Sequence, residues 1–344
     1  MLTRDFDYLL PASSIAQEPL PRGESRLLVL DQRGAGRHSR IRDLPRLLRP
    51  GDLLVLNDTR VIPARLFGRR AGGGGRMELL LVERIGEREW DALVKPGKRA
   101  RPGTTIELGP GLSAEVSAKG GEGRYRLVFS EPVEPHLERL GHVPLPPYIH
   151  RPDTDADRER YQTVFARSPG AIAAPTAGLH FTQELLERIE AAGVESVRIT
   201  LHVGIGTFKP VSAERVEEHR MERERYEMGK EAAEAIGRAR ERAARVVAVG
   251  TTVVRTLESA ALAGGGEVRA GGGSTDLFIT PGFRFQVVDA LLTNFHLPRS
   301  TLLMLVSAFA GREQVLAAYE EAIREGYRFY SYGDAMLAER APAR

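Results

Sequence analysis

Four hydrophobic segments of this chain each run into a cluster of polar residues. They are Leu53–Pro63, Ala174–Thr182, Ile199–Phe208 and Ala290–Ser307. Polar side chains beside a buried backbone are unfavourable unless they are paired, so these clusters indicate a prepared site and not solvated loops. Open α/β sheets bind their ligands at the carboxyl ends of the strands. The four segments therefore favour an α/β enzyme whose site is built from strand ends.

The length of 344 residues exceeds what one core usually holds, and two domains are expected. Strand-like runs occupy residues 25–30 and 53–56, and after Tyr161 further strands alternate with helices. Helices are predicted over Gln183–Ala192 (with Thr182 as N-cap and Gly193 beyond its end), Ser212–Glu227, Lys230–Ala244 and Glu313–Gly326. This alternation is typical of an α/β layered domain.

From about Val61 the sequence changes to short strand-like pieces. They are Ala64–Gly68, Met77–Ile85, Trp90–Lys95, Thr104–Leu108, Leu112–Ser117 and Tyr125–Phe129. Gly-rich or Pro-Gly turns separate them, as in small barrels and sandwiches. The segment from Val143 to Arg160 is interpreted as an exit linker. We predict an α/β catalytic domain formed by residues 1–60 and 151–344, with a small β-barrel domain inserted at 61–150.

The composition excludes several classes of protein. Cysteine is absent, which rules out disulfides, thiolate-held iron–sulfur clusters and zinc sites built on cysteine. No apolar run is long enough to span a bilayer, and the N-terminus has no signal-peptide core. We therefore expect a cytoplasmic protein without a membrane partner. The net charge of +3 does not by itself indicate a nucleic acid, because the distribution of charge matters more.

Three histidines, His180, His202 and His296, stand at the ends of apolar segments. None has the local spacing of a metal site and no cysteine assists, so no metal is expected. Each could be a structural histidine. Three in equivalent positions favour acid–base catalysis or hydrogen bonding to a substrate.

The segment around His296 reads Thr-Asn-Phe-His-Leu-Pro. If Phe295 and Leu297 face the core, strand alternation turns Asn294 and His296 together to the other side. Pro298 then ends regular pairing, so that side can open onto a cleft.

Two other strand ends carry candidate residues. Asn57-Asp58-Thr59-Arg60 could be a turn with Arg60 paired to Asp58, but the clustering of four polar types favours a site. Gly204 and Gly206 follow another strand without the third glycine of a dinucleotide fingerprint, since position 209 is lysine. They can let the strand bend or let a ligand approach the backbone.

The segment from Lys95 to Gly103 is a basic hairpin tip. It carries Lys95, Lys98, Arg99 and Arg101, and three of the five lysines of the chain lie between positions 95 and 119. The tip could be a solvated loop that protects a sheet edge. The concentration of charge favours contact with a nucleic-acid backbone.

Tyr327–Met336 holds four aromatic residues within six positions. Core packing explains them when they are taken alone, although an aromatic face also suits a cationic ligand such as a sulfonium.

Several long motifs run through the chain. They are DFDYLLP (5–11), IAQEP (15–19), SRLLVL (25–30), GDLLVLNDTRVIPARL (51–66), VKPGK (94–98), YQTVFA (161–166), AAPTAGLHFT (173–182), LHVGIGTFKPV (201–211), GTTVVRTLES (250–259), TDLFITPGF (275–283), TNFHLPRSTL (293–302) and YSYGDAM (330–336). Taken together, these motifs resemble the S-adenosylmethionine:tRNA ribosyltransferase-isomerase family over nearly the whole chain.

The resemblance implies the following chemistry. The ribosyl moiety of S-adenosylmethionine is transferred to the amine of 7-aminomethyl-7-deazaguanine, at the wobble position of tRNAs with a GUN anticodon (Tyr, His, Asn, Asp). Isomerisation yields epoxyqueuosine-tRNA, and adenine and methionine leave. S-adenosylmethionine is thus a co-substrate, no metal or nicotinamide is implied, and the fold is an α/β domain with an inserted barrel. We expect a monomer.

On this basis the candidate residues fall into three groups. Catalytic candidates are Asp58, His180, His202, His296 and Asp334. Candidates for substrate binding are Asn57, Thr59, Arg60, Thr176, Gly204, Gly206, Thr207, Thr251, Thr252, Arg255, Asn294, Ser300 and Tyr332. Candidates for tRNA binding are the four cations of the hairpin tip. Two alternatives stay open: a tRNA methyltransferase with the same cofactor, and a non-catalytic RNA-binding module.

Overall fold

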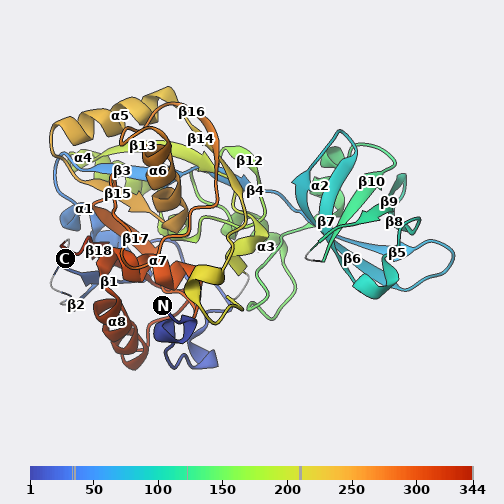
Figure 1. Ribbon diagram of the computed structural model, residues 1–344, viewed down its shortest axis with the longest axis horizontal. Coiled ribbons are helices and arrows are strands. Elements are labelled where there is room, and N and C mark those ends of the chain that lie inside the picture. Colours follow the sequence, from blue (N-terminus) through green and yellow to red (C-terminus); the bar gives the residue numbers. More distant parts are fainter. Residues whose placement is uncertain (33, 35, 122, 209–210, 343–344) are drawn as a thin grey trace. The chain divides into compact units, whose positions relative to one another are not determined.

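The computed structural model describes all residues except 33, 35, 122, 209–210 and 343–344. The chain forms two compact units (Figure 1). The larger unit comprises Met1–Arg60, Pro147–Arg151 and Arg160–Arg344, and the smaller comprises Val61–Pro146 and Pro152–Glu159. The predicted fold class, an α/β body formed by both chain ends with an inserted barrel, is confirmed.

In the part of the chain that the structure describes, nine strands form the sheet of the larger unit. Their order is β16-β14-β13-β3-β15-β17-β18-β1-β2. The bounds are β1 (Arg26–Leu30), β2 (Gly36–Arg40), β3 (Leu53–Asn57), β13 (Glu195–Leu201), β14 (Glu224–Met228), β15 (Val246–Val249), β16 (Gly271–Thr275), β17 (Ala290–Asn294) and β18 (Ala335–Glu339). A separate pair joins β4 (Thr59–Val61) to β12 (Ser168–Ala171).

The direction of the central strands decides where the site can lie. Strands β13, β3, β15 and β17 are parallel, β18 is antiparallel to β17, and β1 is parallel to β18. The carboxyl ends of the first four and the amino ends of β18 and β1 therefore share one edge. All four sequence clusters that end apolar segments are adjacent to this edge or lead into it.

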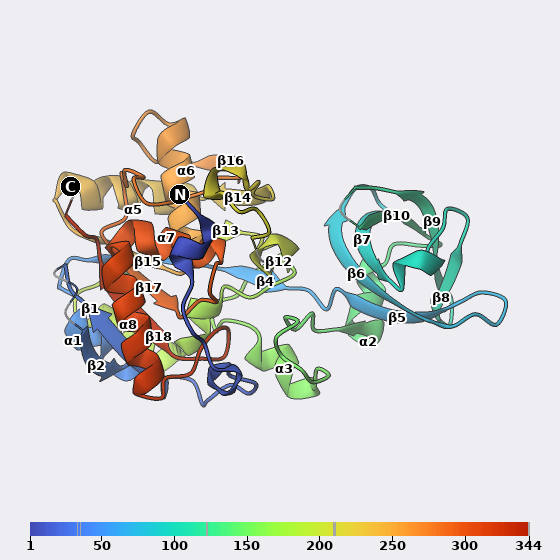
Figure 2. The ribbon, with the colours of Figure 1, turned by 60° about the horizontal axis from the view of Figure 1, so that its bottom comes forward.

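Helices cover both faces of this sheet (Figure 2). Leu53 and Val55 of β3 pack in one apolar cluster with α5–α8, whereas Leu54 and Leu56 pack in another with α1 and α4. Burial on both faces explains the continuous apolar run of this strand. The helices are α1 (Leu44–Leu47), α4 (Gln183–Ala191), α5 (Lys230–Glu241), α6 (Thr251–Ala263), α7 (Thr301–Ala310) and α8 (Arg312–Arg324).

The smaller unit is a closed barrel. Its described strands follow one another in the order β5-β6-β7-β10-β9-β8, and β8 pairs back onto β5. Gly68 lies at this closure, where an added Cβ would come within 2.5 Å of the Glu107 carbonyl oxygen, so only glycine fits. The bounds are β5 (Arg65–Arg70), β6 (Arg76–Arg84), β7 (Glu89–Lys95), β8 (Thr105–Gly109), β9 (Leu112–Lys119) and β10 (Arg124–Phe129), with β11 (Gly141–His142) beside β5 and α2 (Glu134–Leu140) following β10.

The predicted helix over Ser212–Glu227 is wrong. The region contains a short 3-10 turn, η7 (Val216–Glu218), and then β14. Glu224 and Met228 are buried while residue 225 and residue 227 are exposed, which is the alternation of a strand. Pairing with β13 on one side and β16 on the other overrides the helix-like charge pattern.

The other predicted helices are present. The Thr182 hydroxyl caps α4 by accepting a hydrogen bond from the Leu185 amide at 3.0 Å, and Gly193 follows the helix at φ +82°. The predicted linker contains a helix, α3 (Asp155–Arg160), most of which belongs to the smaller unit.

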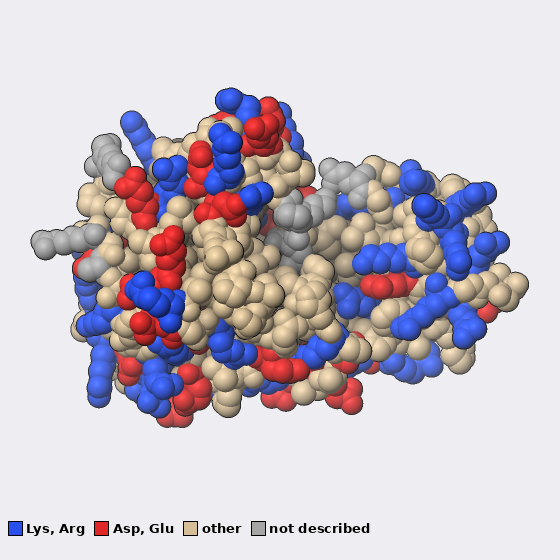
Figure 3. Space-filling view, turned by 90° about the horizontal axis from the view of Figure 1, so that it is seen from below, with Lys and Arg blue, Asp and Glu red and all other residues tan. Residues whose placement is uncertain are grey.

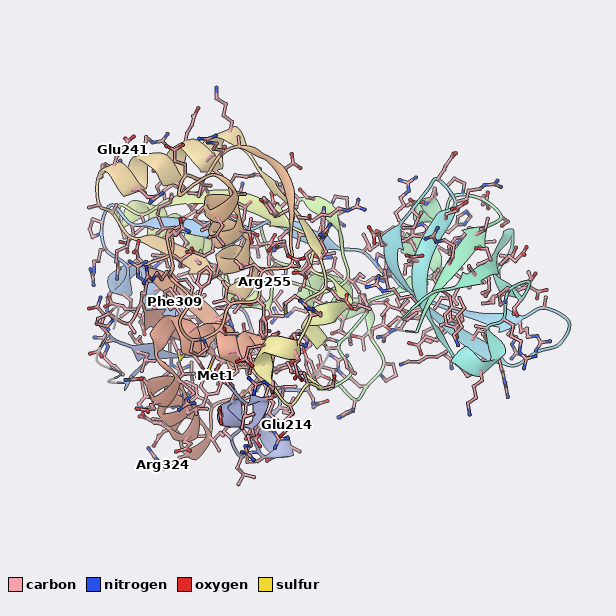
Figure 4. All side chains as sticks on the ribbon, viewed as in Figure 1. Met1, Glu214, Glu241, Arg255, Phe309 and Arg324 are labelled. Atoms are coloured by element: carbon pink, nitrogen blue, oxygen red, sulfur yellow. The ribbon has the colours of Figure 1, made fainter. Side chains whose placement is uncertain are left out.

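Two further observations complete the fold. The N-terminal turn η1 (Thr3–Phe6) lies beside residues 213–217, where the Thr3 amide donates to the Glu214 carbonyl at 2.9 Å (Figure 4). Within the described residues no single helix is long and apolar enough to cross a membrane. Among the described helices, only α7 and α8 taken together are long and apolar enough, and these two helices are bent by 114° relative to each other.

Candidate active site

A pocket opens at the edge of the sheet where the parallel strands end. Side chains and backbone from the ends of β13, β15 and β17 line it, together with the 3-10 turn η5 (Thr176–His180) and the loop before β18. Its lining residues are Tyr148, Ala173, Ala174, Pro175, Thr176, Ala177, Val203, Gly250, Thr251, Thr252, Thr293, Asn294, Phe295, His296, Leu302, Tyr330 and Ser331. Five predicted site residues are thus brought together, namely Thr176, Thr251, Thr252, Asn294 and His296.

His296 contributes the imidazole of this pocket. Its side chain is 5% exposed, and its Nε2 lies 2.9 Å from the Thr293 hydroxyl. The His296 backbone carbonyl accepts a hydrogen bond from the Tyr8 hydroxyl, and its amide donates to the Tyr319 hydroxyl at 3.2 Å. Burial lowers the pKa of His296 to about 3, so the ring is neutral at physiological pH.

Asn294 lies two residues before His296 and lines the same pocket. Its side-chain amide donates to the Tyr330 carbonyl at 2.9 Å, and its Oδ1 is buried without a hydrogen-bond partner among the described residues. The Asn294 side chain is close enough to His180 to raise the pKa of that imidazole, so either His180 or a donor group of a ligand can satisfy the oxygen. Phe295 between them is fully buried, against Tyr319 and Phe329.

Asp58 and His202 form a second polar group beyond the ends of β3 and β13. The Thr200 hydroxyl donates to Asp58 Oδ1 at 2.6 Å, and the Thr59 hydroxyl lies 2.9 Å from His202 Nδ1. Burial lowers the pKa of His202, and the charge of Asp58 opposes that shift. An added Cβ on Gly170, at φ +144°, would come within 3.0 Å of the His202 ring, so this glycine permits the ring's position.

Asn57 connects this group to the pocket. Its side chain bonds both the amide and the carbonyl of Leu201 at 3.0 Å, which joins the ends of β3 and β13. The same side-chain amide lies 3.4 Å from the Thr252 hydroxyl, which lines the pocket. Arg60, predicted to bind substrate, is exposed and does not line the pocket.

His180 does not line the main pocket. It lines a smaller neighbouring pocket with Tyr332, and its Nδ1 is 3.0 Å from the Ser25 hydroxyl. Burial lowers the pKa of His180 to about 4, and the nearby Asn294 amide partly opposes this shift. Ser331 lines both pockets, so the two are neighbours.

Asp334 is held by the backbone. Its two carboxylate oxygens accept hydrogen bonds from the amides of Arg26 and Arg328, each at 2.8 Å. Burial raises the pKa of Asp334, and these two amides oppose the shift. The carboxylate fixes the entry to β1 and does not line the pocket.

Arg255, labelled in Figure 4, does not line the pocket. It projects from α6 to form a buried ion pair with Glu224, and its Nε donates to the Leu277 carbonyl at 3.1 Å. Glu224 in turn accepts a hydrogen bond from the Gly204 amide at 3.0 Å. Gly204 thereby belongs to a network that fixes the turn after β13.

The remaining candidates have other positions. Gly206 and Thr207 lie in η6 (Ile205–Phe208), and the side chain of Thr207 is outside what the structure describes. Ser300 is the N-cap of α7, because its hydroxyl accepts a hydrogen bond from the Leu303 amide at 3.2 Å.

Four polar pocket residues were not assigned a role from the sequence: Thr293, Tyr148, Tyr330 and Ser331, although Tyr330 belongs to the aromatic segment that was considered for a cationic ligand. Thr293 stands in the motif of His296 and could have been included. Tyr148 stands in the predicted linker, and Tyr330 adopts φ +75°, which no sequence pattern indicated.

The hairpin tip belongs to the smaller unit, between β7 and β8, and includes the turn η4 (Gly97–Arg99). Lys95, Lys98, Arg99 and Arg101 are exposed and make no ion pair with another described residue. The β5–β6 and β9–β10 hairpins reach the same end of the barrel and add Arg69, Arg70, Arg76 and Lys119. Figure 3 shows how Lys and Arg side chains gather on this unit.

Comparison with known proteins identifies the family. Residues 3–338 match the family described as queuosine biosynthesis protein. The chain belongs to this family, the S-adenosylmethionine:tRNA ribosyltransferase-isomerases. The family indicated by the sequence motifs is thereby confirmed, and the chain is a tRNA-modifying transferase-isomerase of queuosine biosynthesis.

Its relatives match over their whole length. It is 57% identical to the S-adenosylmethionine:tRNA ribosyltransferase-isomerase of Anaeromyxobacter sp. (strain Fw109-5), over 99% of this chain and 100% of that protein. The enzyme of the same name from Carboxydothermus hydrogenoformans is 56% identical, over 98% and 99%. The crystal structure of S-adenosylmethionine tRNA ribosyltransferase from Thermotoga maritima aligns with TM-score 0.55 and 40% identity, over 97% and 99% of the two chains.

The described residues contain no group of three or more His, Asp or Glu side chains arranged to hold a metal ion. The donors near the pocket are hydroxyl, amide and imidazole groups, which are suited to hydrogen bonding of an organic substrate.

Proposed function

We propose that this chain transfers and isomerises the ribosyl moiety of S-adenosylmethionine onto 7-aminomethyl-7-deazaguanine at the wobble position of tRNA with a GUN anticodon. The products are epoxyqueuosine-tRNA, adenine and methionine. The observation that carries the proposal is the family match, which runs from residue 3 to residue 338. The pocket at the strand ends supports it, because hydroxyl and amide groups from the ends of β15 and β17 and from the turn η5 converge there.

The reaction requires several groups in defined states. A base must remove a proton from the carbon beside the sulfonium, the attacking amine must be neutral, and adenine leaves more readily when a donor bonds its ring. His296 is the titratable candidate that lines the pocket and remains unprotonated at physiological pH. We propose His296 as the proton acceptor and Asn294, Thr176, Thr251 and Thr252 as groups that bond the substrate.

The other candidates receive supporting roles in this proposal. Asp58 is bonded to Thr200, and Thr59 is bonded to His202. Asn57 accepts a hydrogen bond from the Thr59 amide and connects that pair to Thr252. His180 and Asp334 hold the segments behind the pocket through Ser25 and the Arg26 amide.

Product analysis tests the reaction. Incubation with S-adenosylmethionine and tRNA bearing the aminomethyl base should release adenine and methionine in equal amounts. S-adenosylhomocysteine in their place would support the methyltransferase. Salt-dependent tRNA binding without any small-molecule product would support the RNA-binding module.

For tRNA we propose the basic end of the barrel as the backbone-binding surface. Replacing Lys95, Lys98, Arg99 and Arg101 with Gln should weaken tRNA binding, and the salt slope should fall by about 0.7–0.9 for each phosphate that is no longer neutralised. Arg88→Gln, at the opposite end of the barrel, is the matched control. An unchanged affinity and slope in the fourfold variant would show that the tip is only solvated.

The proposal needs S-adenosylmethionine as ribosyl donor and no metal. We expect a monomer that acts in the cytoplasm, where tRNA is modified. Sedimentation of the free protein and of its tRNA complex measures the oligomeric state.

A further inference from the structure

The candidate pocket has an unusual charge property. Among its described lining residues there is no Asp, Glu, Lys or Arg. The two carboxylates among the catalytic candidates do not line the pocket and have other partners: Asp58 accepts from the Thr200 hydroxyl at 2.6 Å, and Asp334 accepts two backbone amides at 2.8 Å. A substrate that carries a fixed positive charge would therefore enter a pocket without a counter-ion.

Two tyrosines form part of the lining. The backbone of Tyr330 has φ +75°, a conformation that residues other than glycine rarely adopt. Its amide donates to the Phe295 carbonyl at 3.1 Å, and its carbonyl accepts from the Asn294 side chain at 2.9 Å. Strained residues that the surrounding structure holds in place cluster at functional sites.

The second ring is that of Tyr148, which packs edge-to-face against Tyr330 and whose hydroxyl bonds Ser331. Burial raises the pKa of both phenols, so both rings stay uncharged at physiological pH. The two tyrosines therefore give the pocket an aromatic lining that carries no charge. Aromatic rings attract cations through their quadrupole, most strongly where water is excluded.

We propose that Tyr330 and Tyr148 bind the sulfonium of S-adenosylmethionine and select it over the neutral thioether. This inference rests on the proposed function and adds specificity-determining residues to it. An uncharged pocket also serves the chemistry. A neighbouring carboxylate would neutralise the sulfonium, whereas rings attract it and leave the adjacent C–H acidic. When that C–H bond breaks, the electron pair stays on carbon beside the positive sulfur and the proton passes to the base.

Binding of three ligands tests the selection. Calorimetry should show that the wild-type protein binds S-adenosylmethionine and the cationic analogue sinefungin more tightly than S-adenosylhomocysteine. Tyr330→Leu should reduce this preference by about 3- to 30-fold, the range expected for a desolvated ring–cation contact. The matched control Tyr330→Phe retains the ring and should keep the preference within about twofold.

Two outcomes would overturn the inference. In one, Tyr330→Leu leaves the preference unchanged. In the other, Tyr330→Leu weakens the binding of all three ligands equally, which is expected if the ring stacks on adenine. If Tyr330→Leu does not fold, Tyr148→Leu and its control Tyr148→Phe supply the same comparison.

A charge placed in the pocket tests the chemical consequence. Ser331→Asp adds a carboxylate to the lining and Ser331→Asn is its neutral isostere. With saturating tRNA, the Asp variant should bind S-adenosylmethionine at least as tightly as the Asn variant but release adenine at least tenfold more slowly. Equal rates would refute the argument about C–H acidity. If the wild-type protein releases no adenine, the proposed function fails, whereas the ligand preference still tests the sulfonium site.

Discussion

Two imidazoles in the α/β unit are buried where they cannot accept a proton without loss of stability. His180 and His296 are 4% and 5% exposed. Burial lowers the pKa of His180 to about 4 and the pKa of His296 to about 3, whereas in the unfolded chain a histidine titrates near 6.5. Below pH 6.5 the unfolded state takes up two protons that the folded state excludes. The free energy of unfolding should therefore fall as the pH falls from about 6.5 towards 4.

The size of this effect follows from linkage. Each histidine contributes a slope of up to about 1.4 kcal/mol per pH unit between its two pKa values. From pH 8 to pH 5, each histidine therefore lowers the free energy of unfolding by about 2 kcal/mol, and the two together lower it by about 4 kcal/mol. Asp334 and Glu258 act in the opposite direction, because burial raises the pKa of each carboxyl and the folded state then binds protons more readily. Variants are needed to isolate the histidine contribution.

The chain has one tryptophan, Trp90, and it lies in the barrel. Urea unfolding can be followed by Trp90 fluorescence for the barrel and by helical circular dichroism for the α/β unit, which contains α4–α8. Between pH 8 and pH 5, the free energy of unfolding should fall by about 4 kcal/mol less in the double variant His180→Asn/His296→Asn than in the wild type. The exposed His150→Asn is the control and should not alter the pH dependence.

Equal acid sensitivity in the double variant and the wild type would refute this reasoning. The reasoning would also be refuted if the two substitutions changed the pH dependence of only the Trp90 transition, because both histidines lie in the other unit.

Three further outcomes are expected. His296→Asn should lower adenine release by roughly 10²–10⁴-fold with a thermal midpoint near that of wild type, and near-normal turnover would remove His296 from the mechanism. Arg255→Met should destabilise the α/β unit by about 3–5 kcal/mol in urea because it leaves Glu224 buried and unpaired, and adding Glu224→Gln should restore part of that loss. Ser300→Ala removes the cap of α7 and should cost about 1 kcal/mol while the affinity for S-adenosylmethionine stays unchanged, whereas weakened binding would indicate direct contact with the substrate.

The strand ends were predictable from sequence because two physical constraints coincide there. A strand buried on both faces needs a continuous apolar run, as in β3, and the polar residues that follow must find partners. Asn57 does so by bonding Leu201 on both its amide and its carbonyl. The barrel strands were predictable for a different reason, since glycine-rich turns separate segments with a two-residue alternation.

The charged segment before α5 was mispredicted because periodicity alone does not reveal that a segment pairs with strands on both sides. Its charges match a helical face, yet β14 lies between β13 and β16, and its inward Glu224 is paired with Arg255. Arg255 was expected at the substrate for a related reason. A conspicuous polar residue in a motif can serve the motif's own fold, and only the three-dimensional partner distinguishes the two roles.

The three histidines show how far sequence reasoning extends. All three follow apolar segments, and the sequence distinguished only His296, which strand alternation places on the same side as Asn294. The structure separates them by their partners: Thr293 for His296, Thr59 for His202 and Ser25 for His180.

Of the three imidazoles, His296 alone is among the residues that line the described main pocket. The same pocket lining has no carboxylate, so the fold offers a neutral proton acceptor beside an uncharged surface. A base with a pKa of about 3 can remove a proton from carbon only if that carbon is strongly acidified. The weak base and the missing counter-ion are therefore consistent with each other, because an unneutralised sulfonium supplies the acidity that such a base requires.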